Sequence, residues 1–170
     1  MKKMKLAVMF GTLLSGSLAS TGLAAQPSSD AASLATLKDA VLCYSAEVEV
    51  DDEPDEALGD QARAIMLETL RVLKLGAVQY DDAINCDLNL DFTFGLDVAG
   101  APSLYNVELS LRSFTARVGA TEIGSATIWS DGYWGGDKDV WDRATYTKRM
   151  TDTLGKSLAQ FTTDYRSLGK

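Results

Sequence analysis

The sequence predicts an α+β fold, a two-layer sandwich in which two helices cover one face of a four-stranded mixed sheet, in the order β-α-β-β-β-α. Three observations lead to this prediction. Residues 84–98 alternate between apolar and polar side chains, and the stretches 55–75 and 140–168 repeat apolar residues every three or four positions. Strands with one apolar face need a helical layer to cover that face.

The first strand is predicted from residue 42 to residue 50 and the first helix from about Asp55 to Leu75. Between them the acidic stretch DDEPDE (51–56) interrupts the strand, because Pro54 has no backbone N–H to donate to a sheet. Gly76 is expected to follow the C-terminal cap of the helix. The strand alternates and the helix carries an apolar stripe; the inward residues are Leu42, Tyr44, Ala46, Val48 and Val50, then Leu58, Ala62, Ile65, Met66, Leu70 and Leu73.

The second strand, residues 84–98, is the clearest element, and the stretch AGAP (99–102) that follows is predicted to be a turn. A third strand has Tyr105 to Leu111 inward at alternate positions. The alternation then changes phase, which predicts a bulge near Arg112 and Ser113. VGAT (118–121) is expected to form a hairpin turn, and residues 123–129 a fourth strand. The inward residues of the second strand are Ile84, Cys86, Leu88, Leu90, Phe92, Phe94, Leu96 and Val98.

The last helix is predicted from about Val140 to Leu168, packed across the sheet. The helix between the first and second strands allows these two strands to be parallel neighbours, and the remaining strands form a meander. The predicted inward stripe of the last helix is Val140, Ala144, Thr147, Thr151, Leu154, Leu158, Phe161, Tyr165 and Leu168.

The amino-terminal residues 1–25 are predicted to be a signal peptide. Three lysines precede a short apolar run, and small residues follow it at a suitable cleavage site. Residues 26–38 are then a flexible lead-in, and residues 39–168 form a single α+β domain. The expected localisation is the periplasm or the extracellular space, with no membrane span in the mature chain.

Cys43 and Cys86 are the two cysteines of the chain, and export predicts that they form a disulfide bond. The alternative is a pair of buried free thiols. The two residues fall on opposite faces of their predicted strands, which indicates that one of them lies at a strand end or a bulge.

Charge and composition exclude several classes of function. Without the three lysines of the signal peptide, 13 basic and 24 acidic residues remain, a net charge of −11. Such an acidic protein is not expected to bind nucleic acid or anionic lipid headgroups. Histidine does not occur in the sequence, which excludes Ser-His and Cys-His catalytic pairs and histidine metal sites. The chain is therefore not expected to be an enzyme.

The stretch WSDGYWGGDKDVW (129–141) contains all three tryptophans and supports two hypotheses. In the first, it is a loop whose Trp129 and Trp141 pack at the edge of the core. In the second, it binds a ligand, because exposed aromatic rings stack on sugars while carboxylates accept hydrogen bonds from hydroxyl groups. The candidate ligand-binding residues are Tyr133, Trp134, Asp131 and Asp137.

The acidic clusters at 51–56 and 137–139 could supply oxygen ligands for Ca²⁺, but neither has the spacing of an EF-hand. We therefore predict no metal and no cofactor. A pair of carboxylates could also act as acid and base in glycoside hydrolysis, so a carboxylate-based hydrolase remains an alternative.

The helix ending in VLKLGAV (72–78), the alternating strand after it and the terminal helix containing LAQFTTDY (158–165) resemble the layout of small exported envelope modules. Examples are the amino-terminal domain of the Tol-system β-propeller protein and the lipopolysaccharide-assembly lipoprotein, although this chain lacks the lipid-anchoring cysteine of the latter. The resemblance covers residues 39–168. It implies a non-enzymatic binding or accessory protein of the bacterial cell envelope, whose partner is an envelope protein or a glycan; a carbohydrate or peptidoglycan binder using residues 129–141 is the alternative.

Overall fold

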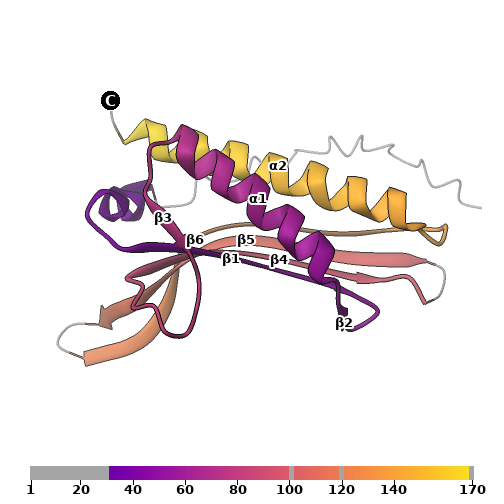
Figure 1. Cartoon of the computed structure of the whole chain (residues 1–170), viewed down its shortest axis with the longest axis horizontal. Coiled ribbons are helices and arrows are strands. Elements are labelled where there is room, and N and C mark those ends of the chain that lie inside the picture. Colours follow the sequence, from indigo (N-terminus) through magenta and orange to yellow (C-terminus); the bar gives the residue numbers. More distant parts are fainter. Residues whose placement is uncertain (1–30, 100–101, 119–120, 169–170) are drawn as a thin grey trace, which may run out of the picture.

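The computed structural model describes residues 31–99, 102–118 and 121–168, so the predicted signal peptide and the centres of two predicted turns lie outside the described residues. Two helices lie side by side on one face of a twisted mixed sheet (Figure 1). The elements are the 3₁₀ helix η1 (Ala31–Lys38), β1 (Leu42–Val50), β2 (Glu53–Pro54), α1 (Glu56–Val72), β3 (Ala77–Gln79), β4 (Leu88–Asp97), β5 (Ser103–Val118), β6 (Thr121–Asp137) and α2 (Arg143–Ser167).

The sheet has six strands in the order β2-β1-β4-β5-β6, with β3 paired to β1. The α+β class is confirmed, whereas the prediction of four strands is wrong. The two additional strands, β2 and β3, are two and three residues long, too short to produce a recognisable alternation. β1 and β4 are parallel neighbours, as predicted, and the pairs β4–β5 and β5–β6 are antiparallel.

The core lies between the sheet and the helices, and the predicted alternation places the correct side chains in it. Cross-strand pairs such as Ala46 with Phe92 and Phe92 with Leu109 point toward the helices and are buried. The predicted bulge is confirmed, because the β5–β6 register shifts between Leu111 and Arg112 and again after Ser113. The buried apolar residues of the long strands that face the helices are Leu42, Tyr44, Ala46, Val48, Leu88, Leu90, Phe92, Phe94, Leu96, Val107, Leu109, Leu111 and Trp129.

β6 is longer than predicted and includes most of the stretch interpreted as a Trp-rich loop. It continues past Trp129 to Asp137 and pairs with β5 as far as Ser103. Glycines led to the loop prediction, but here a glycine makes room for a neighbour: a side chain at Gly135 would lie 2.8 Å from the hydroxyl of Tyr105. Pairing along the whole of β5 therefore outweighs the low strand propensity of glycine.

α2 begins at Arg143 rather than at Val140, and the first half of its predicted stripe is wrong. Tyr146 and Met150 are buried there, whereas Ala144 is exposed. The large side chains set the phase of the helix, because they remove more apolar surface from water than alanine and threonine do. The second half, with Leu154, Leu158 and Phe161 buried, is as predicted.

α1 ends three residues earlier than predicted, and Lys74 rather than Gly76 takes the left-handed conformation after its cap, with φ of 58°. Leu75 donates its backbone N–H to Leu70 O (2.9 Å) and Lys74 donates to Arg71 O (3.0 Å). These are the two hydrogen bonds of a Schellman motif. Leu70 and Leu75 are both buried, so their contact determines where the helix stops.

The segment expected to be a lead-in contributes to the core. Leu34 and Leu37 of η1 are 0% and 3% exposed and belong to the same apolar cluster as the strands and helices. No helix among the described residues is long and apolar enough to span a bilayer.

The disulfide between Cys43 and Cys86 is present, with the two Cα atoms 5.9 Å apart. Cys43 lies in β1 on the side away from the helices, and Cys86 lies two residues before β4 begins. The position of Cys86 outside the strand explains why the two cysteines differ in their sequence phase. The bond attaches the segment between β3 and β4 to β1.

The amino-terminal ends of both helices are joined through Asp55 and Arg143. Asp55 caps α1 by accepting the N–H of Leu58 (3.2 Å), and both guanidinium nitrogens of Arg143 donate to its carboxylate at 2.8 and 3.1 Å. Asp142 caps α2 by accepting the N–H of Thr145 (2.8 Å). The hydrogen bond from Arg143 holds the pKa of Asp55 below its ordinary value of 3.8.

We expect Asp55→Asn to lower the free energy of unfolding at pH 7 by about 1 kcal/mol, the upper range for a partly exposed ion pair. Asparagine caps a helix about as well as aspartate, so the loss reports on the charge. Since the pKa of Asp55 is lower in the folded chain, its contribution is complete above the ordinary value and disappears as the pH falls through the folded value. Urea denaturation of both proteins between pH 7 and pH 2 should show the difference shrinking below pH 3.8.

The matched control is Glu68→Gln, which removes an exposed carboxylate from the same helix. A difference between Asp55→Asn and the wild type that is the same at every pH would contradict the ion-pair explanation.

Candidate functional site

The four candidate residues lie on β6, where successive side chains point to opposite faces of the sheet. Asp131, Tyr133 and Asp137 pair across the sheet with inward residues of β5, so they face the helical layer. Trp134 pairs with Asn106 and faces the other way. Tyr133 and Trp134 are both exposed, but they lie on opposite faces of the sheet, because neighbours in a strand cannot share a face.

Asp131 and Tyr133 lie together beside α2. The hydroxyl of Tyr133 donates to Asp131 Oδ2 (3.0 Å), and burial, together with this hydrogen bond, raises the pKa of Tyr133. Tyr133 is 39% exposed, so more than half of the residue is covered by packing. Asp137 accepts the N–H of Asp139 (3.4 Å) and so shapes the turn that leads to α2.

Trp129 and Trp141 pack at the edge of the core, as the packing hypothesis predicted. Trp129 is 1% exposed, donates its indole N–H to Asp164 Oδ2 (2.9 Å) and meets the edge of Phe161. Trp141 is buried next to Tyr105, and the guanidinium of Arg149 lies 5.2 Å from its ring centre.

Trp134 is different, since 88% of its side chain is exposed. It lies on the surface of the sheet opposite the helices, which we call the open face. On β6 its neighbours on this face are Gly132 and Gly136, which have no side chains to cover the ring. The other described side chains of the open face in this region are Glu47 and Glu49 of β1, Thr93 and Asp97 of β4, and Leu104, Asn106 and Glu108 of β5.

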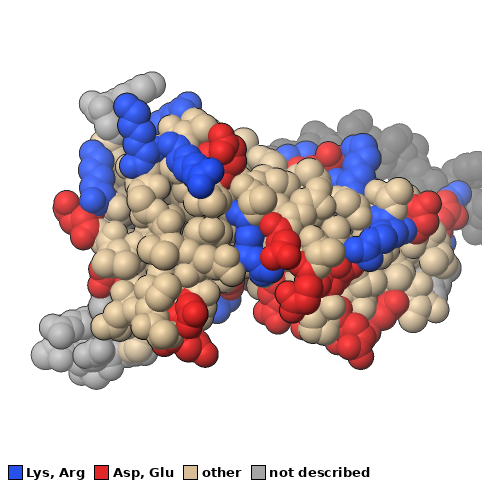
Figure 2. All heavy atoms as spheres, viewed as in Figure 1, with Lys and Arg blue, Asp and Glu red and all other residues tan. Residues whose placement is uncertain are grey.

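A shallow groove of about 520 Å³, the Trp134 groove, crosses this end of the open face. Gly95 of β4 forms its middle, where the side chain of Asn106 lies over the glycine. Figure 2 shows acidic side chains gathered on the sheet side of the molecule toward β2, whereas most basic side chains lie over the helices. The lining residues are Glu49, Asp52, Gly95, Leu96, Asp97, Leu104, Tyr105, Asn106, Trp134 and Gly135.

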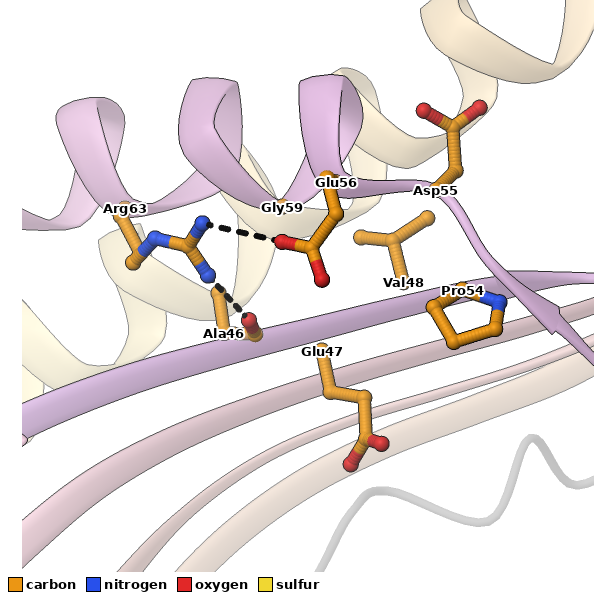
Figure 3. Close-up of a pocket in the computed structure, with 8 residues that line it drawn as sticks. All are labelled: Ala46, Glu47, Val48, Pro54, Asp55, Glu56, Gly59 and Arg63. Atoms are coloured by element: carbon orange, nitrogen blue, oxygen red, sulfur yellow. Dashed lines mark hydrogen bonds and ion pairs between the residues drawn. The ribbon is translucent and has the colours of Figure 1, made fainter. Parts of the chain in front are cut away.

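A second hollow, of about 270 Å³, lies between the start of α1 and the outer side of β1 (Figure 3). Arg63 reaches into it and donates to Ala46 O (2.9 Å) and to Asp60 (2.6 Å), and Glu56 lies 3.8 Å from the same guanidinium. Because this cation already has protein partners, the hollow is a structural junction between helix and sheet rather than a ligand site.

Several carboxylates of the acidic clusters that were considered as Ca²⁺ ligands accept hydrogen bonds from backbone N–H groups instead. Asp51 accepts the N–H groups of Val98 (2.7 Å) and Ala99 (2.8 Å), and Asp55 is the helix cap described above. Among the residues that the structure describes, there is no group of three or more metal-ligating side chains placed to hold an ion.

No protein-family model matches this chain, and no curated protein is similar to it in sequence. The arrangement itself suits binding: an exposed indole for stacking, an amide, and several carboxylates as hydrogen-bond acceptors. The sequence pointed to Trp134 but not to Asn106, Leu104 or Glu49. These residues occupy outward-facing positions of β1 and β5, which the alternation of each strand could have indicated. That they lie next to Trp134 follows only from the strand order.

Proposed function

We propose that this chain is an exported, non-enzymatic binding or accessory protein of the bacterial cell envelope, and that it binds its partner through the open face around Trp134. The observation that carries this proposal is the 88% exposure of Trp134 above a groove. A tryptophan left in water on a sheet face is a characteristic anchor of binding surfaces. The other two tryptophans, Trp129 and Trp141, are buried.

Two further features support export. A disulfide persists in oxidising compartments outside the cytoplasm, and the amino-terminal segment has the composition of a signal peptide. The resemblance to small envelope modules favours an accessory role over catalysis.

A neutral glycan is the second candidate ligand. The indole of Trp134 has no side chains beside it on β6, because Gly132 and Gly136 are its neighbours there, so a sugar ring could stack on it. Asn106, its cross-strand partner, could then exchange hydrogen bonds with sugar hydroxyls.

The test immobilises the disulfide-intact protein on a biosensor and passes over it two soluble envelope fractions, one of proteins and one of peptidoglycan fragments. We expect saturable binding from one fraction, and a loss of about tenfold or more in affinity for Trp134→Ala, as for a central aromatic anchor. Tyr133→Ala, one residue away on the other face, is the matched control and should bind normally. Equal binding by Trp134→Ala and the wild type would refute the open face as the binding surface.

A further inference from the structure

We infer that the partner of the open face is a basic polypeptide segment, bound in an extended conformation across the strands at the Trp134 groove. This inference rests on the proposed function and specifies the chemistry of the partner. Three features of the described residues carry it: the charge of the groove, the distance between its carboxylates and Trp134, and the ability of tryptophan to stack on a cation.

The groove is acidic. Glu49, Asp52 and Asp97 line it, and Glu47 and Glu108 belong to the next row of the same face. Opposite charge attracts most strongly where several like charges lie together on one surface. A partner with positive side chains therefore complements this end of the sheet, whereas an anionic glycan or lipid is repelled.

No described basic side chain lines the groove. Arg112 is on the open face, but it lies at the far end of the sheet and its guanidinium is 3.7 Å from Asp91. Lys138 follows the end of β6. Most of the others are on the two helices: Arg63, Arg71, Arg143, Lys148, Arg149, Lys156 and Arg166. The helical side thus carries basic and acidic side chains together, whereas the described side chains that line the groove include carboxylates and no cation (Figure 2).

The distance across the groove favours a polymer over a small cation. Glu49 is on β1 and Trp134 is on β6, three strand spacings apart in the order β1-β4-β5-β6. At about 4.8 Å per spacing, this separation is about 14 Å. In an extended segment, side chains at positions i, i+2 and i+4 point the same way and span about 14 Å at 3.4 Å per residue. One cation could stack on Trp134 while another meets Glu49.

The chain itself shows that its aromatic rings accept cations. The guanidinium of Arg149 lies 5.2 Å from the ring of Trp141 and 5.5 Å from that of Tyr105. Such contacts are attractive because the face of an aromatic ring is electronegative. Trp134 offers the same surface to an incoming lysine or arginine, with carboxylates close by.

The experiment measures binding of a fluorescein-labelled 12-residue peptide of alternating arginine and serine to the disulfide-intact protein by fluorescence anisotropy. The comparison ligands are an alternating glutamate–serine peptide and chitotetraose, a neutral glycan, the latter measured by calorimetry. The variants are Trp134→Ala, the pair Glu49→Gln with Asp97→Asn on the open face, and the pair Glu68→Gln with Asp152→Asn on the helices. Both pairs change the net charge by the same amount, and a melting curve for each variant establishes that it is folded.

We expect the basic peptide to bind and the acidic peptide not to bind. Trp134→Ala should raise Kd about tenfold, and the open-face pair should raise it roughly fivefold to tenfold, since each exposed ion pair contributes a modest part of the affinity. The helical pair should leave Kd within about twofold, and binding should weaken as salt rises from 50 to 300 mM.

Each contrary outcome is distinct. If the helical pair weakens binding as much as the open-face pair, the attraction is one of net charge and the inference is overturned. If chitotetraose binds in a manner dependent on Trp134 and the basic peptide does not, the basic partner is overturned while the open face keeps its binding function. If Trp134→Ala changes no binding at all, both proposals fail. A dimer, detected by ultracentrifugation and abolished by the open-face pair, would make a second copy of this chain the occupant and would overturn the inference.

Discussion

Replacing Trp129 with alanine is expected to lower the free energy of unfolding by about 3–5 kcal/mol, the usual cost of truncating a buried aromatic side chain to alanine. Trp129 is 1% exposed, lies edge-on to Phe161 with ring centres 5.3 Å apart, and joins β6 to α2 through its hydrogen bond to Asp164. The alanine variant loses this packing and leaves a cavity between sheet and helix. Urea denaturation followed by circular dichroism measures the change without relying on tryptophan fluorescence.

Trp134→Ala is the matched control, because the same residue type is removed from the same strand. Its side chain is 88% exposed, so the expected change is within about 0.5 kcal/mol. Trp129→Phe should fall between the two, since the ring is kept but Asp164 loses a donor. Equal losses for Trp129→Ala and Trp134→Ala would contradict the assignment of the two rings to opposite faces.

Reduction of the bond between Cys43 and Cys86 is expected to lower the free energy of unfolding by about 4 kcal/mol. The two cysteines are separated by 43 positions. In the chain-entropy model, opening a loop of this length gives the unfolded chain that much additional conformational freedom. For a chain of this size the melting temperature should fall by roughly 10 °C. Thermal denaturation with and without a phosphine reductant is the measurement.

The double variant Cys43→Ala with Cys86→Ala should melt close to the reduced wild type, because both lack the cross-link. If the unreduced protein, once denatured, reacts with a thiol reagent at both cysteines, the bond is not formed in the native protein and this prediction fails.

The fold class could be predicted from the alternation of apolar and polar side chains along the strands. This pattern is local, because every strand with one buried face has it. The long strands were predicted as far as their alternation runs, and the bulge near Arg112 followed from a change in its phase. The parallel pairing of β1 and β4 followed from the helix between them. The two short strands were not, since β2 and β3 form only where β1 offers them backbone partners. A partner distant in sequence leaves no periodic signal in so few residues.

The candidate site could be predicted only in part, for the same reason. Trp134 was identified from composition, but the glycines around it suggested a loop, and a loop does not determine which side chains share a surface. Pairing with β5 as far as Ser103 converts that stretch into a strand and separates Tyr133 from Trp134. The residues that surround Trp134 come instead from β1, β4 and β5, and only the strand order brings them together.

The contact between Arg63 and β1 has a consequence for how copies of the protein meet at high concentration. The outer strand of a sheet is a template for further strands, and unpaired carbonyl oxygens on it promote aggregation. On β1 three alternate carbonyl oxygens already have donors: Tyr80 N–H to Tyr44 O (2.9 Å), Arg63 to Ala46 O (2.9 Å) and Asp55 N–H to Val48 O (2.7 Å). Arg63 of α1 thus supplies the donor for Ala46 O, which lies between the parts of β1 that pair with β3 and β2. We therefore expect this side of the sheet to resist the addition of a further strand. The open face lies on another surface and is not covered by these contacts.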